Sequence, residues 1–66
     1  MEITLNGEPR TVDEEITVAG LVEELELDRG AVAVEVNRSI VPRSRHEAHP
    51  LRPGDAVEIV TFVGGG

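Results

Sequence analysis

A single stretch of the chain shows helical periodicity, and it limits the folds available to the rest. Four apolar residues fall at i, i+3, i+4 and i+7: Val18, Leu21, Val22 and Leu25. Glutamates occupy the other side, so the spacing predicts one amphipathic helix over about residues 18–27. Thr17 is placed to cap its N-terminus. Gly20 weakens the first turn, which predicts close packing against a sheet at that point.

Short segments with strand-like alternation lie on both sides of this helix. Ile3 and Leu5 alternate with polar residues and run into Asn6-Gly7, a dipeptide typical of a tight hairpin turn. Further strands are expected at residues 9–12, 31–36, 40–41 and 56–63. The segment at 56–63 is the most apolar, so we expect it to run through the centre of the sheet.

The order of these elements predicts an α+β fold, with a mixed sheet of four to five strands and one main helix packed across one face. The chain has 66 residues and no cysteine, so one hydrophobic core must stabilise it without disulfides. The expected core includes Leu21, Val22, Leu25, Val34 and Ile59. The folded domain is predicted to span residues 1–63, which leaves residues 64–66 as a flexible glycine tail.

The charge of the chain argues against several classes of partner. Thirteen acidic residues face six arginines, and the net charge is −7. Nucleic acids and anionic membrane surfaces favour basic patches, so neither is an expected partner, whereas a protein with a basic docking surface is. The sequence contains neither a signal peptide nor an apolar run of about 20 residues, which favours the cytoplasm.

Few residues suggest catalysis or metal binding. Ser39 and Ser44 lack the spacing of a catalytic triad, and no glycine-rich phosphate loop joins a strand to a helix. His46 and His49 flank Glu47, but zinc proteases place their histidines four apart on a helix. We therefore interpret residues 43–50 as a solvated polar loop and predict no metal site.

The three glycines after the last strand carry the strongest chemical signal. Glycine has no Cβ, so Gly64, Gly65 and Gly66 could enter a narrow active site and present a carbonyl to attack from either side. A frayed end without function is the alternative. Alternation along the last strand predicts that Val57, Ile59 and Thr61 face the helix.

The same alternation turns Glu58, Val60 and Phe62 away from the helix. Val60 and Phe62 would then form a small apolar patch beside the glycines. We predict that this patch is an anchor for partner docking.

The chain resembles the ThiS family of ubiquitin-like sulfur carriers over almost its whole length. The matching stretches are LNGE near the start, TVAGLVEEL in the helix, VAVEVNRSIVPRS in the middle and LRPGDAVEIVTFVGGG at the end. Members often carry Trp at the position of His46, so packing or partner contact in that loop is expected to differ here.

The resemblance implies a β-grasp fold and a carrier role rather than an enzyme. A ThiF-like adenylyltransferase would use ATP to adenylate Gly66, and a sulfur donor supplied by a cysteine desulfurase would convert it to a thiocarboxylate. A ThiG-like thiazole synthase would accept that sulfur in thiamine biosynthesis. No cofactor is expected to be bound by the carrier itself.

Three other functions remain open from the sequence. The related MoaD family carries sulfur for molybdopterin synthesis, and it shares the Gly-Asp turn and terminal diglycine present here at Gly54-Asp55 and Gly65-Gly66. A ubiquitin-like protein modifier would form isopeptide bonds through Gly66. In a ubiquitin-like binding module, the glycines would be inert.

Overall fold

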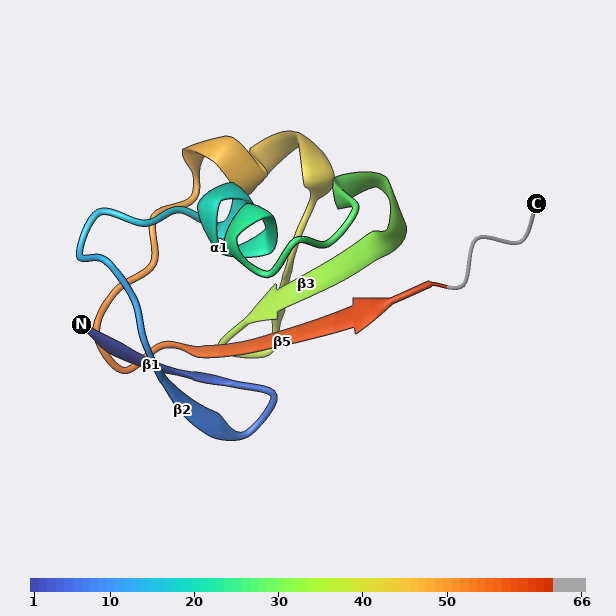
Figure 1. Ribbon diagram of the computed structural model, residues 1–66. Coiled ribbons are helices and arrows are strands. Elements are labelled where there is room, and N and C mark those ends of the chain that lie inside the picture. Colours follow the sequence, from blue (N-terminus) through green and yellow to red (C-terminus); the bar gives the residue numbers. More distant parts are fainter. Residues whose placement is uncertain (63–66) are drawn as a thin grey trace.

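Five strands form one sheet, and a single α-helix crosses one of its faces in the computed structural model, which describes residues 1–62 (Figure 1). The elements in chain order are β1 (Glu2–Leu5), β2 (Glu8–Thr11), α1 (Val18–Glu24), η1 (Arg29–Ala31), β3 (Val32–Val36), β4 (Ser39–Val41), η2 (Arg43–Ala48) and β5 (Ala56–Thr61). The two η elements are 3-10 turns, and they lie on the same side of the sheet as α1 (Figure 1). The opposite face of the sheet has no helix over it among these residues.

The strand order is β2-β1-β5-β3-β4, so β5 is central, as predicted from its apolar sequence. β5 pairs parallel with β1 and antiparallel with β3, which makes the sheet mixed. Asn6 and Gly7 have φ of 50° and 86°, the left-handed values that a two-residue hairpin requires. The turn is therefore as short as it can be, and β2 begins at Glu8, one residue before the predicted start.

The side chain of Asn6 continues the pairing of β1 with β5 after β1 has ended. Its Oδ1 accepts from the backbone N–H of Ile59 at 2.9 Å, and its Nδ2 donates to the carbonyl of Ile59 at 3.3 Å. The backbone N–H of Asn6 donates to Val57 at 2.9 Å. One amide side chain thus takes the place of the next strand residue beside β5.

α1 begins as predicted but ends earlier than the predicted Leu27. The N–H of Gly20 donates to Thr17 Oγ1 at 3.1 Å, which confirms the N-cap. Gly20 does not pack against the sheet as predicted. A Cβ there would lie 3.1 Å from Ile16 Cγ1, in the segment before the helix.

The helix ends because Glu26 takes a left-handed conformation, with φ of 59°. The N–H of Glu26 donates to Glu23 at 2.9 Å and that of Leu27 donates to Val22 at 3.1 Å. These two bonds define a Schellman motif, in which the left-handed position normally favours glycine. The helix was predicted to reach Leu27, but the left-handed residue Glu26 ends it earlier.

The core lies between α1 and the covered face of the sheet. Its buried members are Ile3, Val12, Ile16, Val18, Leu21, Val22, Val32, Val34, Val36, Val41, Leu51, Val57 and Ile59. Leu25 was predicted among the core residues; it is the C-cap residue, and it packs half-buried against the margin of the core.

The segment predicted as a solvated loop is instead the 3-10 turn η2, and it buries one of its histidines. His46 is 1% exposed, and its Nε2 lies 2.9 Å from the carbonyl oxygen of Val41. A carbonyl only accepts, so Nε2 carries the proton in this contact. Nδ1 is buried without a hydrogen-bond partner among the described residues.

We expect Leu21→Ala to destabilise the protein far more than Leu25→Ala. Leu21 is fully buried, so its truncation should lower the free energy of unfolding by roughly 2–5 kcal/mol. Truncation of the half-buried Leu25 should lower the free energy of unfolding by about 1–2 kcal/mol, because less apolar surface is removed from water there on folding. Urea unfolding followed by far-UV circular dichroism measures both, and equal losses would contradict this description of the core.

We expect Glu26→Gly to stabilise the protein by about 0.5–1.5 kcal/mol, because glycine adopts the left-handed conformation without steric cost. Glu23→Gly is the matched control: it removes the same side chain inside the helix and should destabilise by about 0.5–1 kcal/mol. Thermal unfolding of both variants measures whether each substitution raises or lowers the stability. A destabilised Glu26→Gly would show that the conformation at Glu26 is not strained.

Candidate functional site

The uncovered face of the sheet carries the apolar residues nearest the chain end. Along β5, Val57 and Ile59 are buried against the helix side, whereas Val60 and Phe62 are 58% and 56% exposed. The predicted outward direction of Val60 and Phe62 is therefore confirmed. Thr61 was expected to face the helix, but it is exposed because the core ends at Ile59.

Ile40 adds a third exposed apolar side chain, at 73%, which the sequence analysis did not single out. In the sheet register Ile40 lies opposite Glu35, and Glu35 lies opposite Glu58. Ala33 lies opposite Val60. Since alternate residues share one face, all five belong to the uncovered face. We call the surface formed by Ala33, Glu35, Ile40, Glu58, Val60 and Phe62 the outer sheet face.

Two carboxylates face each other in the middle of the outer sheet face. Glu35 and Glu58 are directly opposed on β3 and β5, and both are exposed. Like charges at directly opposed positions destabilise a sheet. Among residues 1–62 the ion pairs are Arg10–Glu24 and Arg29–Glu47, so neither glutamate is neutralised by an arginine there.

The edge of β5 beside Phe62 is open. Ile59 uses its backbone N–H and C=O toward Asn6, away from β3. Thr61 has the same parity in the strand, so its polar groups point to that same side, where β1 has already ended at Leu5. The described residues supply no strand there.

Phe62 follows the last strand residue but is still held to the fold. Its N–H donates to the carbonyl of Ala31 at 2.8 Å. The predicted adenylation site Gly66, the predicted threading residues Gly64 and Gly65, and the predicted domain boundary after residue 63 all lie outside the described residues.

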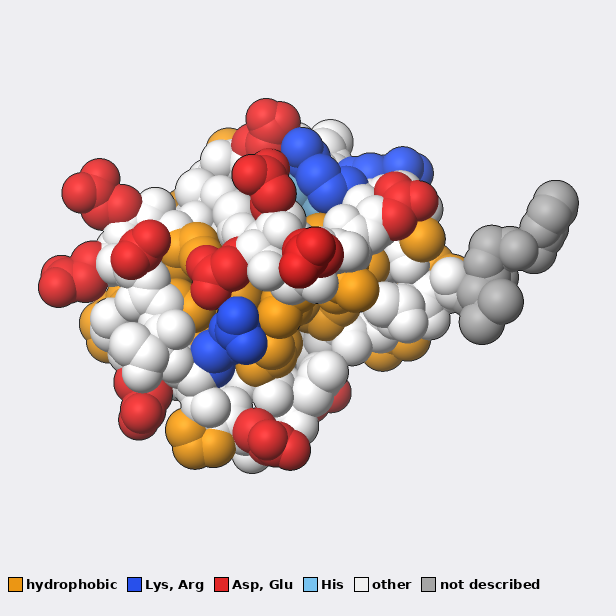
Figure 2. All heavy atoms as spheres, in the orientation of Figure 1, with side chains coloured by type: hydrophobic (Ala, Val, Ile, Leu, Met, Phe, Trp, Pro, Cys, Tyr) orange, Lys and Arg blue, Asp and Glu red, His pale blue; other side chains and the backbone are white. Residues whose placement is uncertain are grey.

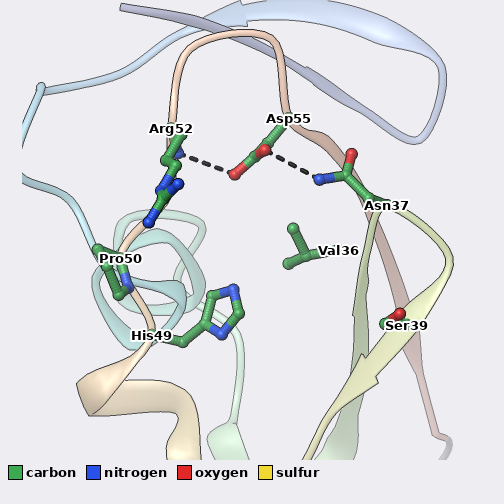
Figure 3. Close-up of a pocket in the computed structure, with 7 residues that line it drawn as sticks. All are labelled: Val36, Asn37, Ser39, His49, Pro50, Arg52 and Asp55. Atoms are coloured by element: carbon green, nitrogen blue, oxygen red, sulfur yellow. Dashed lines mark hydrogen bonds between the residues drawn. The ribbon is translucent and has the colours of Figure 1, made fainter.

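Two adjoining cavities open elsewhere on the domain, near the turn between β3 and β4. The larger, of about 420 Å³, is drawn in Figure 3 and is lined by Val36, Asn37, Ser39, His49, Pro50, Arg52 and Asp55. Asp55 accepts from the Arg52 backbone N–H at 2.8 Å and from Asn37 Nδ2 at 3.0 Å. This carboxylate therefore closes a loop, and it has a structural partner on each oxygen.

The described residues contain no group of three or more potential metal ligands. None of their helices is both long enough and apolar enough to cross a membrane. Carboxylates are spread across the visible surface, and most arginines in view gather at its upper right (Figure 2). The arrangement offers surfaces for binding a protein, and one of them contains Phe62, the last described residue.

Comparison with known proteins agrees with this geometry. The model of the ThiS family matches residues 3–66. A sulfur carrier protein ThiS of Thermus thermophilus is 36% identical over 64 residues, which cover 97% of this chain and 98% of that protein. A thiazole synthase of Paramagnetospirillum magneticum is 44% identical over all 66 residues, but the chain spans only 20% of its length.

A solved structure of the same family superimposes over the full length. The crystal structure of the thiamine biosynthesis protein ThiS from Geobacter metallireducens has a TM-score of 0.84 and 39% identity, and each chain is covered completely. The fold is therefore the ubiquitin-like β-grasp. With a family match over almost every residue and a structural match over all of them, the chain belongs to the ThiS family.

Proposed function

We propose that this protein is a sulfur carrier of thiamine biosynthesis and that it carries sulfur on Gly66. The observation that supports this most strongly is the match of the whole chain to proteins named as ThiS sulfur carriers. A ThiF-like adenylyltransferase joins the Gly66 carboxylate to AMP from ATP and releases pyrophosphate. A persulfide derived from a cysteine desulfurase then displaces AMP to form an acyl disulfide, and a thiol cleaves its S–S bond, which leaves the thiocarboxylate and a new disulfide.

A ThiG-like thiazole synthase is the proposed acceptor of that sulfur. Proteins named thiazole synthase contain a segment similar to this whole chain, which supports a close association of the two activities. The protein acts as a co-substrate of these enzymes in the cytoplasm and binds no cofactor of its own. Gly64 and Gly65 thread into the partner's active site.

The part of the outer sheet face formed by Glu35, Glu58, Val60 and Phe62 is the proposed docking surface for the adenylating enzyme. Val60 and Phe62 supply exposed apolar anchors beside the chain end. The opposed Glu35 and Glu58 destabilise the free sheet, and a basic group of the partner placed between them relieves that repulsion. A complementary partner therefore gains both apolar burial and charge neutralisation at one surface.

Deleting Gly65 and Gly66 is expected to leave stability unchanged and abolish sulfur loading. The buried core runs from Ile3 to Ile59, so the unfolding temperature should not move. Incubation with the adenylating enzyme, ATP and a sulfur donor should raise the intact mass only of the full chain, by sulfur in place of oxygen.

A chain extended by one alanine is the control for this deletion. It keeps every native residue but displaces the reacting carboxylate by about 3.5 Å, beyond what attack geometry tolerates, so it should also fail to load. Sulfur on the truncated chain, or no sulfur on the intact one with competent partners, would contradict the carrier proposal.

Changing Phe62 to Ser is expected to weaken binding to the adenylating enzyme about tenfold or more, because an anchor residue is lost at the docking surface. The unfolding temperature should move little, since the side chain is largely exposed. Ile40→Ser is the matched control, with an even more exposed apolar residue two strands away, and should change affinity less than about threefold. Calorimetric titration reads affinity. A Phe62→Ser variant that lost stability and affinity together would instead assign Phe62 to the fold.

A further inference from the structure

The arginines of this acidic protein are concentrated in one segment. Residues 38–52 contain four arginines and one glutamate, a net charge of +3. The rest of the chain contains two arginines and twelve carboxylates, a net charge of −10. The charge is therefore unevenly distributed along the chain, with a basic segment between β3 and β5 and an acidic remainder. We call residues 38–52 the basic segment.

Ion pairing leaves this basic segment largely uncompensated. The single acidic residue of the segment, Glu47, is paired with Arg29 at 3.4 Å, from outside it. The other ion pair within residues 1–62 joins Arg10 to Glu24 at 3.2 Å. The four arginines of the segment, Arg38, Arg43, Arg45 and Arg52, thus have no carboxylate partner among those residues.

Two of these arginines line the adjoining cavities beside β4. The cavity of about 420 Å³ includes Arg52, and a second of about 300 Å³ includes Arg45. Both share Ser39 and His49, so they form one groove. In Figure 3 the side chains of Arg52 and His49 lie on one side of the cavity, and Ser39 lies across from them. We call the surface of Ser39, Ile40, Arg45, His49 and Arg52 the basic groove.

Asp55 also lines the larger cavity and remains negatively charged, so it offsets part, but not all, of the positive charge of Arg45 and Arg52. Both of its oxygens already accept hydrogen bonds, from the Arg52 backbone and from Asn37 Nδ2. Asn37 in turn accepts from the N–H of Ala56 at 2.9 Å. The two hydrogen bonds of Asp55 tie its carboxylate to the turn. Neither of these two bonds involves the guanidinium of Arg52 or the imidazole of His49.

The strand that borders the groove has a free hydrogen-bonding edge. The backbone of Ile59 bonds to Asn6 and therefore points away from β3. Val34, which lies opposite Ile59, must then point its own backbone groups away from β5 and toward β4. There Val34 pairs with Val41. Ile40, one residue from Val41, therefore points its N–H and C=O away from β3. β4 is the last strand of the sheet, and no strand among residues 1–62 covers that side.

From these observations we infer that the basic groove binds an extended acidic segment of a partner protein, which adds to the edge of β4. The backbone of the segment bonds to Ile40, and its carboxylates face Arg45, Arg52 and His49. Charge complementarity selects an acidic occupant. Its residues differ from Glu35, Glu58, Val60 and Phe62, which form the proposed docking surface for the adenylating enzyme, and its test does not use sulfur transfer.

A capped peptide of alternating valine and glutamate, titrated into ¹⁵N-labelled full-length protein, tests the inference. We expect amide shifts to concentrate at Ser39–Val41 and at residues 49 and 52. The Arg45→Gln, Arg52→Gln double variant should bind about tenfold more weakly, and Arg10→Gln, Arg29→Gln, which has the same net charge, less than about threefold. Thermal unfolding confirms that both double variants are folded.

Control probes distinguish the possible occupants. The same peptide with glutamine in place of glutamate should bind much more weakly, and one methylated at alternate backbone nitrogens should lose binding if it adds to β4. Equal binding of the glutamine peptide, shifts outside the groove, or no shifts at millimolar peptide would each overturn the inference. Shifts in the groove with inorganic phosphate but not with the glutamate peptide would also overturn it, in favour of a small-anion site.

Discussion

The pairing of β5 on both of its edges is the constraint on which the rest of the fold depends. Without β5, the β1–β2 hairpin and the β3–β4 hairpin would be separate two-stranded units, which are marginally stable alone. Parallel pairing to β1 is short, covering Thr4 and Leu5, and the side chain of Asn6 extends it to Ile59. One amide therefore strengthens the junction that joins the two halves of the sheet.

Sequence periodicity was sufficient for most of the fold because the spacing of apolar residues marks the buried face of each helix and strand. It predicted the mixed sheet, the central last strand, the cap at Thr17 and the outward direction of Val60 and Phe62. It predicted the wrong end for the helix, because Glu26 adopts a conformation that the side chain itself does not favour. The local hydrogen bonds of the Schellman motif at the helix end prevailed over the apolar pattern.

Long-range contacts explain the other errors. His46 lies in a polar stretch of the sequence, and its neighbours there do not indicate that α1 and β4 bury it. They also do not indicate that its Nε2 bonds to the carbonyl of Val41. Ile40 was passed over because a two-residue apolar segment has no periodicity, whereas the register shows which face it occupies. The basic groove brings together Ser39 and Arg52, which are close only because the chain returns past β4.

The position of Phe62 limits where a partner acting on Gly66 can dock. Phe62 is bonded to Ala31, and the four residues that follow it reach at most about 14 Å even when fully extended. A partner that acts on Gly66 must therefore contact the end of the domain near Val60 and Phe62. Val32 pairs with Thr61 at that end of β3, whereas Val36, which lines the basic groove, pairs with Val57 at the other. The basic groove and the apolar residues beside the chain end thus lie toward opposite ends of β3.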